Sequence, residues 1–150
     1  MAKWMIQDEQ ICETPFQILM DEDAAQGTET EAISIARFLE WVEGNASGST
    51  GVIVEPGENP DVLLPHFPRI SFVAISFPAF TDGRGYSHAR RIRKNHEFEG
   101  PIVSFGDVLR DQLMHMKRCG ISAFILREDQ DPEGCLEVFS RFPQFYQKSL

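Results

Sequence analysis

The feature that most constrains the fold is a series of four short apolar runs that begins at Gly51. The runs are GVIVEP, SFVAISF, PIVSFG and SAFIL, and they are rich in β-branched and aromatic residues without a polar alternation. Such runs are typical of strands that are buried on both faces. Helix-like segments at 86–95 and 108–119 separate the last three runs, and a third segment at 132–142 follows them. Strands that alternate with helices predict βαβ units and a parallel sheet.

We therefore expect an α/β fold with a single domain of about four βα units. Its sheet should be mostly parallel and either half-barrel-like or a small open sheet. A chain of 150 residues, 42% of them hydrophobic, is long enough to bury one such core. We assign the domain to residues 31–150, where Thr28 and Glu31 form a capping-box pattern before an apolar helical face that ends at Gly44. Residues 1–30 form an N-terminal segment that the sequence defines poorly.

Composition limits the partners and the compartment. A net charge of −9 disfavours nucleic acid, which requires an extended basic face. No apolar run is long enough for a membrane span, and the N-terminal MAKWMIQDEQ lacks the apolar stretch of a signal peptide. Three cysteines that form neither a CxxC motif nor an even set fit free thiols in a reducing compartment. We expect a cytoplasmic protein that contacts neither membranes nor nucleic acid.

The most unusual stretch is FPAFTDGRGYSHARRIRK, which follows the second apolar run. From Asp82 to His96 there are five arginines and lysines against one aspartate. This segment therefore carries +4, while the rest of the chain carries −13. A single basic patch in an acidic chain suits a small anion or an acidic partner.

The glycines in this stretch predict a small-oxyanion site. Glycine allows backbone conformations that other residues avoid, and the N–H groups at the start of the next helix favour negative charge. Arginine adds a rigid fork of donors that matches an oxyanion. The candidate anion-binding residues are Gly83, Arg84, Gly85, Ser87 and Arg90. The alternative is a tight turn in which Asp82 caps the helix and the later cations form a solvated helix face.

A second candidate site consists of Asp82 and Asp107 as catalytic acid and base. Asp107 follows the third apolar run, and the carboxyl ends of parallel strands meet at one edge of a sheet, where ligands gather. Nearby arginines would lower the pKa of both carboxyl groups, which weakens the case for an acid. The GRGYSH stretch lacks the third glycine of a dinucleotide fingerprint, and three cysteines are too few for a cubane iron–sulfur cluster. The cofactor therefore remains unknown.

Three motifs carry a resemblance to a known family. FPAFTDGRGYSHARRIR, GDVLRDQLMHMKRCGISAF and the terminal FYQ resemble a bacterial family of short proteins of unknown function that are described as probable oxidoreductases involved in sulfite reduction. The resemblance covers about residues 31–147. It places the characteristic polar groups of the family at Asp82, Arg84, Tyr86, Ser87, Arg90, Arg93, Gly106, Asp107, Arg110, Asp111 and Gln112. Ser104 and Phe105 depart from the family pattern.

The resemblance implies a pathway more than a reaction, because the family's description depends largely on genes that neighbour assimilatory sulfite reductase. Sulfite reduction needs metal and flavin cofactors, for which this chain has no signature. We therefore expect an accessory or small-oxyanion-binding protein of assimilatory sulfite reduction, with sulfite reductase as a candidate partner. The alternatives are an oxidoreductase that acts directly and a structural interaction module. A small sheet with exposed edges also predicts a homodimer.

Overall fold

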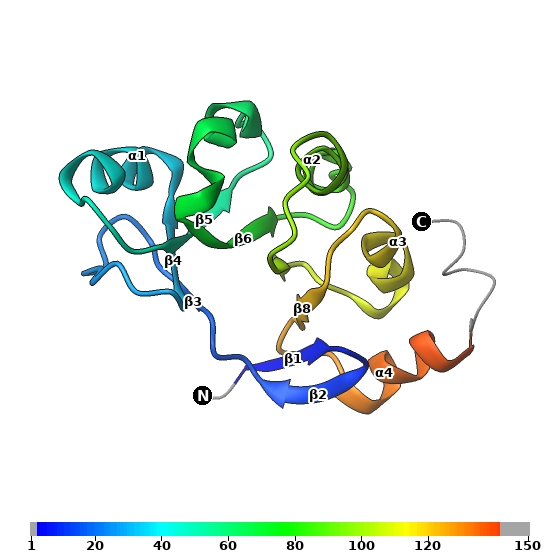
Figure 1. The fold of residues 1–150 in the computed structure, drawn as a ribbon. Coiled ribbons are helices and arrows are strands. Elements are labelled where there is room, and N and C mark those ends of the chain that lie inside the picture. Colours follow the sequence, from blue (N-terminus) through cyan, green and yellow to red (C-terminus); the bar gives the residue numbers. More distant parts are fainter. Residues whose placement is uncertain (1–2, 142–150) are drawn as a thin grey trace.

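The computed structural model describes residues 3–141 and contains one curved sheet with helices along its outer side (Figure 1). In the described residues the strands are β1 (Trp4–Gln7), β2 (Gln10–Glu13), β3 (Gln17–Ile18), β4 (Glu31–Ser34), β5 (Thr50–Val54), β6 (Ile70–Phe77), β7 (Ile102–Gly106) and β8 (Ala123–Ile125). The helices are α1 (Ile35–Gly44), α2 (Arg84–Arg90), α3 (Leu113–Arg118) and α4 (Pro132–Arg141). A 3₁₀ segment covers Pro60–Arg69, a π turn covers Arg91–Asn95 and a short 3₁₀ turn covers Arg110–Gln112.

The sheet has the order β2-β1-β8-β7-β6-β5-β4-β3. Strands β3 to β8 are parallel, and β1 pairs antiparallel with both β8 and β2. The sheet curls into half a barrel, which confirms the expected α/β class and mostly parallel sheet. The four apolar runs correspond to β5, β6, β7 and β8. The N-terminal segment, whose structure the sequence did not define, adds β1, β2 and β3 to the same sheet.

Both faces of the central strands are buried, as the unbroken apolar runs predicted. On the helix-covered face, strand residues such as Val73 and Ile75 pack with Phe38, Ile92 and Leu113 of the helical layer. On the concave face a smaller cluster contains Ala32, Ile53, Phe72, Ala74, Val103, Ala123 and Ile125. No helix among residues 3–141 has the length and apolarity needed to cross a membrane.

The helix expected to run from the capping box to Gly44 is wrong in its first part. Residues 31–34 form β4, which pairs with β3 and β5, and α1 begins only at Ile35. Ser34 caps this helix, because its hydroxyl accepts a hydrogen bond from the Arg37 N–H at 3.3 Å. The Glu31 carboxylate does accept from the Thr28 N–H at 3.1 Å, but the contact closes a turn before a strand. Burial of residues 31–33 in the sheet therefore outweighs the local helix signal.

The two predicted helices on either side of β7 are present, but neither is a single α-helix over its predicted range. The segment 86–95 divides into α2 and a π turn, in which the His96 N–H donates to the Arg91 carbonyl five residues earlier. The segment 108–119 narrows to a 3₁₀ turn and α3. Gly120, with φ of +104°, ends α3. Helix α4 confirms the third segment as far as residue 141, and residue 142 lies outside the described residues.

Candidate functional site

The carboxyl ends of β6 and β7 lie at one edge of the sheet. Phe77 is opposite Gly106 in the register, and the Asp107 N–H donates to the Phe77 carbonyl at 2.7 Å. Gly106 has a φ of +98°, and a Cβ atom there would lie 2.5 Å from the Phe77 carbonyl oxygen. Only glycine fits this crossing without strain. The close approach brings the loops after β6 and β7 together, as their strand-end positions predicted.

Asp107 ties three strand-end loops together. Its Oδ2 atom accepts from the Phe80 N–H at 3.2 Å, and its Oδ1 atom lies 3.3 Å from Nη1 of Arg127. Arg127 also binds both carboxylate oxygens of Asp129 at 2.7 Å. The guanidinium lowers the pKa of Asp129 to about 2, and the two carboxylates raise the pKa of Arg127. The charge of Arg127 is therefore already compensated by two carboxylates.

Asp82 and Arg84 form a similar local pair at the same edge. Nε and Nη2 of Arg84 donate to the Asp82 carboxylate at 3.0 and 2.8 Å, and the Arg84 N–H donates to Oδ1 at 3.0 Å. Hydrogen bonds from Arg84 lower the pKa of Asp82 to about 2, so Asp82 is ionised at neutral pH and holds no proton to donate as an acid. The Arg84 side chain is 63% exposed.

The predicted glycine turn has ordinary geometry at its first glycine. Gly83 has a φ of −84°, so it adopts no conformation that is closed to other residues. A Cβ atom on Gly85 would come within 2.6 Å of the Phe77 ring, so this glycine lets α2 pack closely on β6. Ser87 is exposed on α2. Arg90 donates to Sγ of Cys119, which directly follows the neighbouring α3, at 3.4 Å.

Other residues carried over from the family motif have structural contacts. The Tyr86 ring packs edge-on against His115, with ring centroids 4.1 Å apart. The Arg110 N–H donates to Gln130 at 3.0 Å. The Gln112 Oε1 atom is buried and accepts no hydrogen bond from the described residues.

The cations of the basic segment separate onto two sides. Arg84 binds Asp82, and Arg91 binds Asp61 at 2.6 and 2.7 Å. Within residues 3–141, no carboxylate pairs with Arg90, Arg93 or Lys94. Helical spacing explains the division, because positions 90, 93 and 94 share one face, whereas 84 and 91 lie on another. The unpaired charge therefore gathers beside α3.

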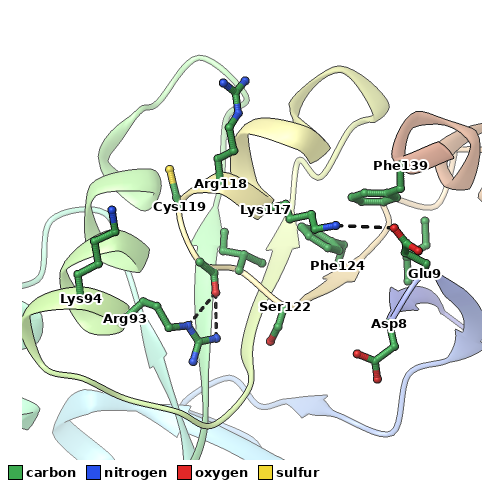
Figure 2. A pocket seen from close by; sticks show the side chains of 13 residues that line it. Asp8, Glu9, Arg93, Lys94, Lys117, Arg118, Cys119, Ser122, Phe124 and Phe139 are labelled. Atoms are coloured by element: carbon green, nitrogen blue, oxygen red, sulfur yellow. Dashed lines mark hydrogen bonds and ion pairs between the residues drawn. The ribbon is translucent and has the colours of Figure 1, made fainter. Parts of the chain in front are cut away.

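A cavity of about 650 Å³ lies next to these cations, at the amino-terminal end of β8 (Figure 2). Its wall contains Ile6, Asp8, Glu9, Arg93, Lys94, Lys117, Arg118, Cys119, Gly120, Ile121, Ser122, Phe124 and Phe139. The lining residues come from the β1–β2 turn, the π turn, the end of α3, β8 and α4. Figure 2 shows Lys94 and Arg118 on either side of the Cys119 sulfur. We call this the basic cavity.

Arg93 builds the wall of the basic cavity. Its guanidinium donates to the Gly120 carbonyl at 2.9 and 3.0 Å, and to the carbonyls of Phe98 and Gly100 at 2.7 and 2.8 Å. These contacts use four of its five N–H donors, and no carboxylate within residues 3–141 pairs with its positive charge. Burial lowers the pKa of Arg93 from a very high ordinary value, so the side chain stays charged at neutral pH.

Cys119 is 2% exposed, and its thiol is protonated at neutral pH. Burial raises the pKa of Cys119, although Arg90, Arg118 and Lys94 act in the opposite direction. His115 lies 3.9 Å from Sγ, and burial together with Arg118 and Arg90 lowers the pKa of this imidazole. Neither group supplies a negative charge to the surrounding cations. The positive field of Arg90 and Lys94 is therefore not reduced by these two groups.

A second cavity, of about 840 Å³, lies near the carboxyl edge. Phe16, Ile18, Phe105 and Ile125 form part of its wall, and Arg127 also lines it. The sheet positions these residues by curling the β3 and β8 ends toward each other (Figure 1). In the described part of the chain, no three His, Cys, Asp or Glu side chains group closely enough to hold a metal ion.

The sequence did not predict the basic cavity, because α3 and the β1–β2 turn contribute to it from distant positions. The available signal was the helical spacing of Arg90, Arg93 and Lys94, which places three cations on one face.

Comparison with known proteins gives one family match. The family model described as bacterial protein of unknown function (DUF934) matches residues 51–150. These residues include the cations of the basic cavity and both strand-end loops after β6 and β7, but not the β1–β2 turn. No curated protein matches the chain.

Proposed function

The chain belongs to the DUF934 family of bacterial proteins of unknown function, and we propose that it is a cytoplasmic accessory protein of assimilatory sulfite reduction that binds a small sulfur oxyanion. The pathway comes from the resemblance of the GRGYS and GDVLRDQ regions to proteins described in that context. The ligand class comes from the electrostatics of the basic cavity. Three free cysteines fit the reducing compartment in which this pathway operates.

The observation that carries the proposal is that three cations at one cavity, Arg90, Arg93 and Lys94, have no carboxylate partner among residues 3–141. Arg93 and Lys94 lie in its wall, and Arg90 reaches Cys119 at its edge. In a chain with a net charge of −9, such a group creates a local positive field that attracts small anions. By contrast, the arginines at the carboxyl edge are paired with Asp82, Asp107 and Asp129.

The cations have different parts in this proposal. Lys94 is exposed and has a flexible stem, so it can reach an oxyanion. Arg93 contributes a fixed charge because carbonyl oxygens hold its guanidinium. Lys117 lies 3.7 Å from Glu9, so part of its charge is compensated. Because the Cys119 thiol is protonated, these contacts favour binding over covalent chemistry.

Calorimetric titration with sulfite and sulfate tests the proposal. The ionic strength is held constant with sodium chloride, because sulfate also stabilises proteins by exclusion from their surface. Lys94→Gln should weaken binding by about tenfold, as expected for the loss of one charge-assisted contact. Arg84→Gln is the matched control. It also removes one cation, but Arg84 belongs to the glycine turn that the sequence predicted and not to the basic cavity.

If the wild type and Lys94→Gln bind the oxyanion with equal affinity, the oxyanion does not bind in the basic cavity. If only Arg84→Gln loses binding, the oxyanion binds instead at the glycine turn that the sequence predicted, which contains Gly83, Arg84, Gly85 and Ser87. The pathway is tested separately by deleting the gene. The strain should then require cysteine on sulfate or sulfite but not on sulfide, and the protein should copurify with sulfite reductase.

A direct oxidoreductase is the second proposal, favoured by the arrangement at the carboxyl edge. Asp107 is held by Phe80 and Arg127, and Arg127 lines the cavity of about 840 Å³. Ligands of parallel α/β folds usually bind at this edge. Thermal-shift and absorbance measurements with flavin and nicotinamide cofactors test this function. Protein without a cofactor spectrum, and without a shift of its melting temperature, would contradict it.

A further inference from the structure

We infer that Asp61 is a positioning residue for the basic cavity, because it holds the π turn that carries Lys94 in the shape that directs this lysine toward the oxyanion. The inference rests on the proposed oxyanion function and deepens it by naming a residue that acts on the site from outside. Asp61 itself is not among the described residues that line the cavity.

Asp61 binds both ends of the π turn. Its carboxylate accepts hydrogen bonds from Arg91, the first residue of the turn, at 2.6 and 2.7 Å. Its Oδ1 atom also lies 2.9 Å from Nε2 of His96, the residue that follows the turn. The backbone joins the same two residues, because the His96 N–H donates to the Arg91 carbonyl at 3.1 Å. One carboxylate therefore closes the turn a second time, across the i→i+5 hydrogen bond that defines it.

The bond to Asp61 accounts for the histidine at position 96. The His96 side chain is only 5% exposed, and its ring packs against Phe67 with centroids 5.3 Å apart. Its Nδ1 atom is buried and has no hydrogen-bond partner in the described part of the chain. An apolar side chain would fill this position without an unpaired polar atom. Hydrogen bonds from Arg91, and also from His96, lower the pKa of Asp61, so the acceptor is ionised at neutral pH.

The π turn is held from two fixed sides. Asp61 lies at the start of the 3₁₀ segment, whose Pro60 and Leu63 are buried, and its N–H donates to the Asn59 side chain at 3.0 Å. On the other side, Arg93 donates to three backbone carbonyls at 2.7 to 3.0 Å. The backbone of the turn is therefore fixed between the 3₁₀ segment and the end of α3.

The direction of Lys94 depends on this backbone. Its side chain is exposed and pairs with no carboxylate among residues 3–141. A π turn contains one residue more than an α turn, and each residue of an α-helix advances by about 100°. A turn that relaxed to α geometry would therefore change the direction of position 94, which Figure 2 shows beside the Cys119 sulfur.

The sign of the effect separates positioning from simple electrostatics. Removal of the Asp61 carboxylate takes away a negative charge and leaves Arg91 without its partner. Charge alone therefore predicts that an anion binds more tightly to the variant. Loss of positioning predicts the opposite, because Lys94 no longer has a fixed direction.

Calorimetric titration with sulfate at constant ionic strength tests the inference. Asp61→Ala should weaken binding by about threefold, which is less than the loss of about tenfold in Lys94→Gln, because the lysine charge is displaced and not removed. Asp61→Glu keeps the carboxylate and should recover part of the affinity. Combined with Lys94→Gln, Asp61→Ala should weaken binding no further, because it acts through Lys94.

Glu58→Ala is the matched control. It removes a carboxylate from the same loop, but Glu58 accepts from the Glu55 N–H at 2.8 Å and makes no ion pair with the π turn in residues 3–141. This variant should bind sulfate at least as tightly as the wild type. Near-ultraviolet circular dichroism at the titration temperature verifies that each variant is folded, and Asp61→Asn replaces Asp61→Ala if the alanine variant fails to fold.

The outcomes distinguish this inference from the proposed function. If sulfate binding depends on Lys94 but is unchanged or tighter in Asp61→Ala, the positioning role is wrong and the oxyanion function stands. If Asp61→Ala weakens binding equally with and without Lys94, Asp61 does not act through this lysine and the inference is also wrong. If Lys94→Gln binds sulfate as tightly as the wild type, the oxyanion function and the positioning role both fail.

Discussion

Replacement of Gly106 with alanine should lower the free energy of unfolding by several kcal/mol. The left-handed φ of +98° costs an L-residue roughly 1–2 kcal/mol. The new Cβ atom, 2.5 Å from the Phe77 carbonyl oxygen, adds about 1–3 kcal/mol of overpacking because both groups belong to backbone-constrained strands. Weakening of the hydrogen bond from Asp107 to this carbonyl costs about another 1 kcal/mol. We therefore expect a loss of about 3–6 kcal/mol.

Equilibrium unfolding in urea measures this loss as a lower transition midpoint with an unchanged slope. Gly83→Ala is the matched control, because Gly83 has a φ of −84° and a Cβ atom there would meet no atom within 4 Å. That substitution should be neutral or stabilise by up to about 1 kcal/mol through the unfolded state. If Gly106→Ala stays within about 0.5 kcal/mol of the wild type, the argument from strain and close approach is refuted.

Four further predictions concern the charges, the thiols and the sheet edges. Arg93→Met should destabilise the fold by about 2–3 kcal/mol in urea, because three partly buried carbonyls lose their donor; an unchanged midpoint would contradict this. The folded-state pKa of Asp82 is about 2 against an ordinary 3.8, so the stability from its pair with Arg84 is complete above pH 3.8 and lost as the pH falls toward 2. Arg84→Met should therefore lose less stability than the wild type between pH 3.8 and pH 2. Parallel curves of unfolding free energy against pH for the two proteins would contradict a stabilising pair of Asp82 and Arg84. Iodoacetamide followed by mass spectrometry should modify the partly exposed Cys12 before the buried Cys119, whereas the reverse order would show that Cys119 is reactive. Because β2 and β3 are open edges, sedimentation equilibrium should give a homodimer, and a monomer at micromolar concentration would refute that proposal.

The strands with a local signature were predictable, and the others were not. Residues 51–54 and 70–77 are buried on both faces, so their apolar runs are continuous and indicate strands without further information. In contrast, β3 has only two residues and exists because Gln17 and Ile18 pair with β4. Pairing of this kind depends on the tertiary fold, which a local pattern does not contain.

The two candidate sites differ in the same way. The pair of Asp82 and Arg84 is separated by two residues and is local, so the sequence contained the information that this arginine has a carboxylate nearby. The basic cavity needs the π turn, the end of α3 and the β1–β2 turn together. Hydrogen bonds from Arg93 to Gly120 join the π turn to the end of α3, and the β1–β2 turn comes near them because β1 pairs antiparallel with β8.

The basic segment indicates a site only after its cations are separated by the side of the helix that each one faces. Net charge alone treated all five cations of 82–96 as one patch, yet Arg84 and Arg91 turn toward carboxylates. Parallel βαβ connections place α2 and α3 side by side on the same face of the sheet, which the contact from Arg90 to Cys119 also demonstrates. The cations of α2 that face α3 therefore add to those at the end of α3, where the helix dipole also favours positive charge. The cations therefore gather between two helices at the amino-terminal edge, and that position favours the basic cavity over the glycine turn for the proposed oxyanion.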